Sequence, residues 1–208
     1  MKKYILILFC LFCASGAVGY FLGGDEVKPA AAETPATVST PAVSATAKEQ
    51  VAQSAPKPTN LAAQYNMDAD FILIRKGEFK LYAVNAAGET VATYGCALGK
   101  GEGQKQKEGD MKTPDGTFVV DEILDASYWT HDFKDGKGEI KGAYGPWFIS
   151  LDTTNLSKGA WGGIGIHGTH DPASIGTRAS EGCIRLNNAD IEQLKKFAKV
   201  GMKVIIEE

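Results

Sequence analysis

Short apolar segments separated by glycine-containing turns are the feature of this sequence that most restricts its fold. Residues 70–75 hold Phe-Ile-Leu-Ile between two charged residues, and residues 78–84 alternate apolar and polar side chains. Because successive side chains of a strand point to opposite faces, these patterns predict two β-strands. Residues 85–88, Asn-Ala-Ala-Gly, predict the turn that leads to the next strand. Further strands are predicted at residues 90–97, 117–124, 146–151, 163–167 and 202–207.

Only one segment has the pattern of an amphipathic helix. Apolar residues recur at helical spacing between residues 188 and 200, Asn187 or Asn188 is suited to cap its start, and Gly201 is suited to end it. Many short strands with a single helix are typical of packed sheets. The predicted fold class is therefore mainly β, a β-sandwich of two mixed sheets with one α-helix in the C-terminal half. Residues 99–112, rich in glycine and charge, predict a mobile surface loop.

The chain begins with two lysines and a long uncharged segment. Lys2 and Lys3 precede a mostly apolar run at residues 4–22, an arrangement typical of export signals. As a helix this run would reach about 28 Å, close to the roughly 30 Å hydrocarbon core of a bilayer. We therefore predict that residues 1–24 are a signal peptide or an N-terminal membrane anchor. The protein is then exported to the cell envelope or periplasm, and it is anchored to the inner membrane if the segment is retained.

A linker is predicted between this segment and the folded domain. Residues 28–60 are rich in Ala, Thr, Ser, Val and Pro, and they contain no aromatic residue and no glycine. Such a composition cannot bury a core, and its prolines favour an extended tether. The predicted organisation is a disordered linker at residues 25–64 and one catalytic domain at residues 65–208.

His167 and Cys183 are the residues that point most directly to chemistry. Each lies in a glycine-containing cluster, Ile-His-Gly-Thr and Ser-Glu-Gly-Cys-Ile-Arg respectively. A free thiol with a pKa of roughly 8.5 is mostly protonated at neutral pH, and an imidazole within reach supplies the base that it needs. The glycines allow the backbone to approach a substrate closely. Considered alone, a pair of this kind is more often a structural cysteine and an unrelated histidine.

The two clusters together resemble the signature of the YkuD-type L,D-transpeptidase catalytic domain, whose members are cysteine enzymes that process peptidoglycan stem peptides. Residues 112–118, Lys-Thr-Pro-Asp-Gly-Thr-Phe, are similar to the TPxGxF element of the same family, and the order of the elements agrees. The resemblance covers about residues 68–207. It implies a β-sandwich, Cys183 as nucleophile, His167 as general base and the backbone carbonyl of Gly168 as the group that orients the imidazole.

Substrate-binding residues are expected around the nucleophile. The backbone that leads into Cys183 can donate to the oxyanion of a tetrahedral intermediate, and Gly182 permits the turn. Arg185 follows Cys183 by two positions and so shares its face in an extended segment, where it would bind a stem-peptide carboxylate; a surface ion pair is the alternative. Ser180 either adds a hydroxyl contact or is a turn residue. Thr169 completes the predicted set.

The predicted function is that of a peptidoglycan L,D-transpeptidase. It would transfer an acyl group from a stem tetrapeptide through a Cys183 thioester to an amine acceptor, in cell-wall synthesis or remodelling. Two alternatives stay open: an L,D-carboxypeptidase or hydrolase that releases a stem-peptide-linked group, and a catalytically silent wall-binding module. Intact His167 and Cys183 argue against the silent module. Glu181 stands where some family members carry histidine, which leaves the handling of the acceptor open.

Composition and motif spacing limit which classes of partner and cofactor we expect. The formal net charge is −3 and there is no large basic run, so we expect no nucleic-acid partner. No nucleotide-binding or metal-binding spacing occurs, so neither a cofactor nor a metal is predicted. The expected partners are peptidoglycan stem peptides and, through the N-terminus, a membrane. Cys96 is interpreted as a small strand residue and not as a disulfide partner of Cys183, because Cys183 is the expected nucleophile.

Overall fold

The computed structural model describes residues 60–208. The predicted signal peptide or anchor (residues 1–24) lies outside the described residues, as does the predicted linker (residues 25–64) up to residue 59. The described part begins with helix α1 (Leu61–Tyr65), whose apolar side chains pack against the sheet although most of the helix falls within the predicted linker. Within this part of the chain, no helix is long and apolar enough to span a membrane.

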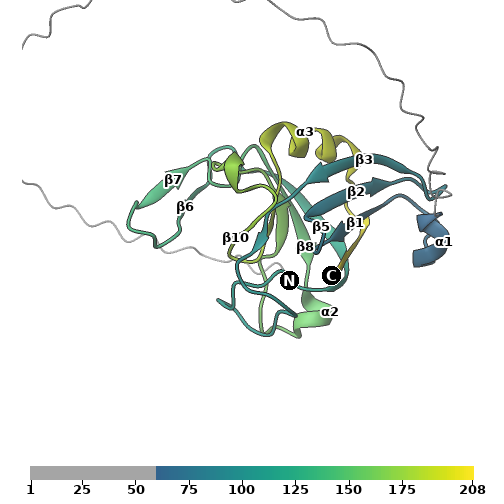
Figure 1. Cartoon of the computed structure of the whole chain (residues 1–208), viewed down its shortest axis with the longest axis horizontal. Coiled ribbons are helices and arrows are strands. Elements are labelled where there is room, and N and C mark those ends of the chain that lie inside the picture. The colour runs from purple at the N-terminus through teal and green to yellow at the C-terminus, as the bar shows by residue number, and fades with distance from the viewer. Residues whose placement is uncertain (1–59) are drawn as a thin grey trace, which may run out of the picture. The chain divides into compact units, whose positions relative to one another are not determined.

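Eight strands form one mixed sheet, which curls as Figure 1 shows. They follow one another across the sheet in the order β11, β9, β8, β5, β12, β1, β2 and β3. The pairings of β1 with β12 and of β11 with β9 are parallel, and the others are antiparallel. The strands are β1 (Phe71–Arg75), β2 (Lys80–Val84), β3 (Thr90–Gly95), β5 (Gly116–Asp125), β8 (Trp147–Asp152), β9 (Gly165–His167), β11 (Ile184–Arg185) and β12 (Lys203–Glu207).

Two further pairs of short strands accompany the main sheet. One pair is parallel, and the other is an antiparallel hairpin that projects from the molecule on the side away from α1 in Figure 1. The remaining elements are β4 (Leu98–Gly99) paired with β10 (Arg178–Ser180), β6 (Thr130–Asp132) paired with β7 (Glu139–Lys141), the helices α2 (Thr154–Ser157) and α3 (Asn188–Phe197), and the 3-10 helix η1 (Pro172–Ser174).

Strand β1 is covered on both of its faces, which explains its uninterrupted apolar sequence. Its first four residues are fully buried. Phe71 and Leu73 pack in a small cluster with α1, whereas Ile72 and Ile74 belong to the main core, which also holds apolar side chains of α3. The core therefore lies between the curled sheet and α3.

The prediction of a mainly β fold with mixed strands is confirmed. Each predicted strand is present, and its ends differ from the predicted ones by no more than two residues. The division into two sheets is approximate, because hydrogen bonds join eight strands into one curled sheet. Besides the predicted helix, the described residues form the short helices α1 and α2.

The start of helix α3 differs from the predicted capping in a way that affects the neighbouring loop. Asn187 occupies the N-cap position, but its side chain makes no capping hydrogen bond. The side-chain oxygen of Asn188 instead accepts a hydrogen bond from the backbone N–H of Thr169 at 2.8 Å. The start of α3 thus holds the segment that follows His167. The helix ends at Phe197, before the predicted end at Gly201.

We expect the substitution Leu81→Ala in β2 to lower the free energy of unfolding by about 2–5 kcal/mol, because Leu81 is fully buried in the main core and its truncation leaves a cavity. Val91→Ala in β3 is the matched control, since Val91 is half exposed and its loss should change the free energy by less than about 0.5 kcal/mol. Chemical denaturation measures both values. Similar losses for the two variants would contradict this account of the core.

Candidate active site

The parallel pairing of β9 with β11 brings the predicted catalytic residues together. His167 at the end of β9 is the register partner of Arg185 in β11, and Cys183 directly precedes β11. Register partners in adjacent strands point to the same face of a sheet, and so do residues two positions apart. His167, Arg185 and Cys183 therefore project from one face although the histidine and the cysteine are far apart in the sequence.

These three side chains line one cavity of about 570 Å³, a size typical of small-ligand sites. Its wall is mainly apolar and aromatic, with a few charged groups of both signs. Besides His167, Cys183 and Arg185, the lining residues include Lys105, Met111, Trp129, His131, Phe133, Tyr144, Phe148, Ile164, Ser180 and Glu181.

The imidazole of His167 is fixed in orientation and in tautomer. Its ring stacks on Phe148 at a centroid distance of 5.5 Å and meets the edge of Tyr144 at 4.9 Å. Nδ1 lies 2.6 Å from the backbone oxygen of Gly168, and because a carbonyl only accepts, Nδ1 must carry the hydrogen. Nε2 then keeps a free lone pair, as a general base requires. Burial lowers the pKa of His167 to about 3, so the ring is neutral at physiological pH.

The thiol of Cys183 is also held in its neutral form. Burial raises its pKa, and a backbone hydrogen bond from Gly165 and the positive charges of Arg185 and Lys105 offset this only in part. The thiol donates to the backbone oxygen of Gly163 at 3.3 Å. The resting site therefore contains a thiol and a neutral imidazole, and no preformed ion pair.

Ser180 and Gly182 shape the turn before Cys183. The Ser180 hydroxyl accepts from the N–H of Gly182 at 3.1 Å and donates to the carbonyl of Cys183 at 2.6 Å. Gly182 has a φ of +138°, which side chains other than hydrogen disfavour. The N–H of Gly182 is thus used within the turn. Within residues 60–208, the N–H of Cys183 has no hydrogen-bond acceptor.

Arg185 is a buried cation without a carboxylate partner in the described part of the chain. The residue is 5% exposed, and no acceptor within residues 60–208 binds its Nε. Its guanidinium lies 5.0 Å from the ring centroid of Phe133, near the β6–β7 hairpin. The ion pair considered as the alternative from sequence does not form within these residues. A buried guanidinium with an unused N–H group in a cavity wall is suited to bind a carboxylate.

Glu181 is held at the cavity by a chain of hydrogen bonds that runs through His131 of β6. Burial raises the pKa of Tyr144 to about 12, so its hydroxyl stays protonated and can donate to Nδ1 of His131 at 3.1 Å. Nε2 of His131 then carries the hydrogen and donates to the Glu181 carboxylate at 3.0 Å. His131 thus holds the Glu181 carboxylate next to Cys183.

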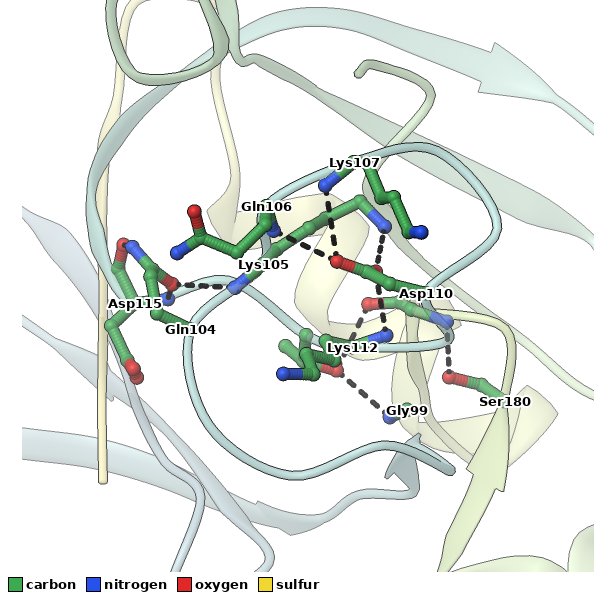
Figure 2. Close-up of polar contacts among 11 residues, drawn as sticks. Gly99, Gln104, Lys105, Gln106, Lys107, Asp110, Lys112, Asp115 and Ser180 are labelled. Atoms are coloured by element: carbon green, nitrogen blue, oxygen red, sulfur yellow. Dashed lines mark hydrogen bonds and ion pairs between the residues drawn. The ribbon is translucent and has the colours of Figure 1, made fainter. Parts of the chain in front are cut away.

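Part of the surface loop predicted at residues 99–112 folds around one carboxylate. In Figure 2, residues 104–112, which we call the Asp110 loop, surround the side chain of Asp110. This carboxylate accepts from three backbone N–H groups of the loop at 2.8–3.2 Å and from Lys105 Nζ at 2.7 Å. Burial opposes ionisation of Asp110, but the hydrogen bonds outweigh it and hold the pKa of this carboxyl well below its usual range.

Lys105 is a site residue that the sequence analysis missed. Its side chain is almost fully buried in the cavity wall, where Nζ lies 2.7 Å from Asp110 and 5.8 Å from the ring centroid of Trp161. Its charge lowers the pKa of Cys183. No pattern in the sequence distinguishes this lysine from the exposed lysines around it, because its burial depends on how the Asp110 loop folds.

The structure places the predicted site residues in two groups. Cys183, His167, Arg185 and Ser180 line the cavity. Three others, Gly168, Thr169 and Gly182, do not line the cavity, but their backbone groups make hydrogen bonds that hold the lining segments. Gly168 binds the imidazole of His167, Thr169 binds the start of α3, and Gly182 forms the turn before Cys183.

Comparison with known proteins agrees with this fold. The family model described as the YkuD L,D-transpeptidase catalytic domain matches residues 69–206. The Bacillus subtilis protein YqjB is 31% identical over 137 residues, which are 65% of this chain and 70% of YqjB. The B. subtilis protein YkuD is 38% identical over 65 residues, 31% of this chain, and the match spans only 35% of YkuD.

Solved structures show the same fold. An L,D-transpeptidase from Mycobacterium smegmatis has a TM-score of 0.51 at 16% identity, over 68% of this chain and 60% of that one. L,D-transpeptidase 3 from Mycobacterium tuberculosis has a TM-score of 0.50 at 15% identity, over 68% of this chain and 62% of that one. The described domain thus has an L,D-transpeptidase fold. The family match over most of this domain shows that the chain belongs to the YkuD family of L,D-transpeptidase catalytic domains.

The buried neutral state of His167 should make stability depend on pH. Unfolding returns the pKa of His167 from about 3 towards 6.5, so the unfolded chain binds one more proton between these values. The free energy of unfolding should therefore fall as the pH decreases below 6.5, by up to about 1.4 kcal/mol per pH unit more than in His167→Gln. Urea denaturation from pH 7 to pH 4 measures both slopes. Parallel slopes would contradict a neutral buried His167.

Proposed function

We propose that this protein is a peptidoglycan L,D-transpeptidase that acts through a Cys183 thioester. The observation that carries the proposal is the shared cavity of Cys183 and His167, in which the bond from Nδ1 to Gly168 leaves Nε2 as the only basic nitrogen of the ring. The family membership supports the substrate class, stem peptides of peptidoglycan.

In the first half-reaction, Cys183 attacks the amide carbonyl that precedes a D-amino acid. The thiol proton passes to Nε2 of His167 while the sulfur–carbon bond forms and the carbonyl oxygen becomes an oxyanion. Collapse of this intermediate breaks the carbon–nitrogen bond. The leaving amine takes the proton from His167, and the acyl group remains on Cys183 as a thioester.

In the second half-reaction, an amine acceptor attacks the thioester. His167 takes a proton from the amine and returns it to the sulfur as the new amide forms and the thiol leaves. Arg185 binds a stem-peptide carboxylate during both steps, because its buried guanidinium faces the cavity without a carboxylate partner among residues 60–208.

The position of Glu181 favours an amine over water as the acceptor. A carboxylate beside the nucleophile raises the pKa of Cys183 and so does not assist the first half-reaction. The same negative charge attracts an ammonium group into the cavity, where the acceptor must bind. Glu181 therefore supports transfer, and hydrolysis by a carboxypeptidase is the alternative that the experiments below distinguish.

The cellular location forms part of the same proposal. Stem peptides lie outside the cytoplasmic membrane, and the two lysines followed by an apolar run at residues 4–22 are typical of an exported protein. We propose that the catalytic domain acts in the cell envelope or periplasm, either free or anchored through the N-terminus.

Carbapenems should acylate Cys183, because their strained amide imitates the acyl donor. Mass spectrometry with peptide mapping should show one adduct on Cys183 in the wild type and none in Cys183→Ala. Cys96→Ala should keep the adduct, since burial raises the pKa of Cys96 to about 12 and the residue is fully buried. An adduct on Cys96, or none on the wild type, would refute the assigned nucleophile.

Transfer and hydrolysis can be separated with a disaccharide-tetrapeptide offered with and without a D-amino acid or a second stem peptide. The wild type should form the exchanged or cross-linked product when the amine is present. Glu181→Gln should lower the ratio of transfer to hydrolysis, because the loss of its charge weakens ammonium binding, and it should not slow acylation, because the same charge raises the pKa of Cys183. Tripeptide as the sole product at high amine concentration would favour the carboxypeptidase instead.

A further inference from the structure

A buried threonine connects the TPxGxF element to the turn that carries the nucleophile. Thr113 is 1% exposed. Its hydroxyl oxygen lies 2.8 Å from the backbone N of Gly99 and 2.9 Å from the backbone oxygen of Gly182. Its side chain thus bridges two segments that are far apart in the sequence, one of which leads directly into Cys183.

The direction of these two hydrogen bonds is determined. The N–H of Gly99 can only donate, so the hydroxyl oxygen of Thr113 accepts there. A hydroxyl has a single hydrogen, which must then point to the carbonyl of Gly182. The bonds run from Gly99 through Thr113 to Gly182, and consecutive bonds in one direction polarise each other.

This arrangement fixes the orientation of the peptide bond between Gly182 and Cys183. A peptide unit is planar, and in the trans form its C=O and N–H point in opposite directions. No cis peptide occurs in the described residues. Because the carbonyl of Gly182 is bound to Thr113, the N–H of Cys183 points away from Thr113. Within residues 60–208 this N–H has no acceptor, whereas the N–H of Gly182 is bound to Ser180.

We propose that Thr113 is a positioning residue that holds the Cys183 N–H as the donor to the oxyanion of the acyl-transfer reaction. This proposal rests on the proposed function and deepens it. Thr113 touches neither the substrate nor the reacting atoms, and its effect passes through the Gly182–Cys183 peptide. A donor that is fixed before the reaction stabilises the developing charge without reorganisation at that moment.

Close backbone packing around Thr113 supports this role. A Cβ atom at Gly99 would lie 2.3 Å from the backbone oxygen of Met111, and one at Gly182 would lie 2.9 Å from that of Lys112. Only glycine fits at both ends of the bridge. On one side the segment before Thr113 is held by the carboxylate of Asp110 (Figure 2). On the other side the backbone N–H of Lys100 donates to the backbone oxygen of Ser180.

The experiment compares two reactions of the same thiol in the full chain. Acylation by a carbapenem passes through an oxyanion, whereas alkylation by iodoacetamide is a direct displacement without one. The variants are Thr113→Val, which keeps the shape and loses the hydroxyl, and Thr113→Ser, which keeps the hydroxyl. Thr153→Val is the matched control, since Thr153 is a buried threonine that also donates to a backbone carbonyl, that of Trp161 at 3.5 Å.

We expect Thr113→Val to slow acylation by on the order of 10- to 100-fold, somewhat less than the loss of a whole oxyanion donor, and to leave the alkylation rate within about threefold. Thr113→Ser and Thr153→Val should keep both rates near those of the wild type. Labelling of the buried Cys96 by iodoacetamide reports unfolding, so rates are taken from molecules in which Cys96 is unmodified. If Thr113→Val does not fold, Thr113→Ala is compared with Thr113→Ser in the same way.

The outcomes separate this inference from the proposed function. A wild type whose Cys183 is alkylated but not acylated would overturn the proposed function and this inference with it. A wild type that is acylated, together with a Thr113→Val variant of unchanged acylation rate, would overturn only the role of Thr113. Equal losses of acylation and alkylation would also overturn it, because they would show a general structural role.

Discussion

The parallel pairing of β9 with β11 is the interaction on which the rest of the site depends. Hydrogen bonds between these two short strands make His167 and Arg185 register partners and place Cys183 just before the second strand. One face of the sheet then presents a base, a cation and a thiol. The surrounding elements hold this pair in place: Phe148 of β8 stacks on the imidazole, and Asn188 of α3 binds the backbone of Thr169.

The site is held largely by backbone groups, together with one buried ion pair, that of Lys105 with Asp110. The carbonyl of Gly168 orients the imidazole, and the hydroxyl of Ser180 closes the turn before Cys183. Backbone N–H groups organise the Asp110 loop. Backbone donors and acceptors keep their geometry without the desolvation cost of a buried ion pair. Arg185, which has no carboxylate partner among residues 60–208, remains available for a charged ligand.

Sequence patterns predicted the strands and the pair of His167 and Cys183, but not the side chains that surround this pair. The period of two at residues 78–84 and the apolar run at residues 70–75 identify strands because each strand face is either buried or exposed. The burial of Lys105 depends on how the Asp110 loop folds, and the link from His131 to Glu181 joins residues 50 positions apart. No local period encodes either contact. The signal peptide or membrane anchor at residues 1–24 and the linker up to residue 59 lie outside the described residues and stay predictions.

Burial sets the order of events in the proposed mechanism. Because it raises the pKa of Cys183 and lowers that of His167, a thiolate–imidazolium pair is unfavourable in the empty cavity. Proton transfer then becomes favourable only when the sulfur attacks and the negative charge moves to the carbonyl oxygen. A site of this kind relies on donors that are already in position where the charge develops, and much less on an activated thiolate. A preformed thiolate–imidazolium pair would make a fixed oxyanion donor less important. Because this site has no such pair, the fixed N–H of the Gly182–Cys183 peptide matters more, and Thr113 holds that peptide in place.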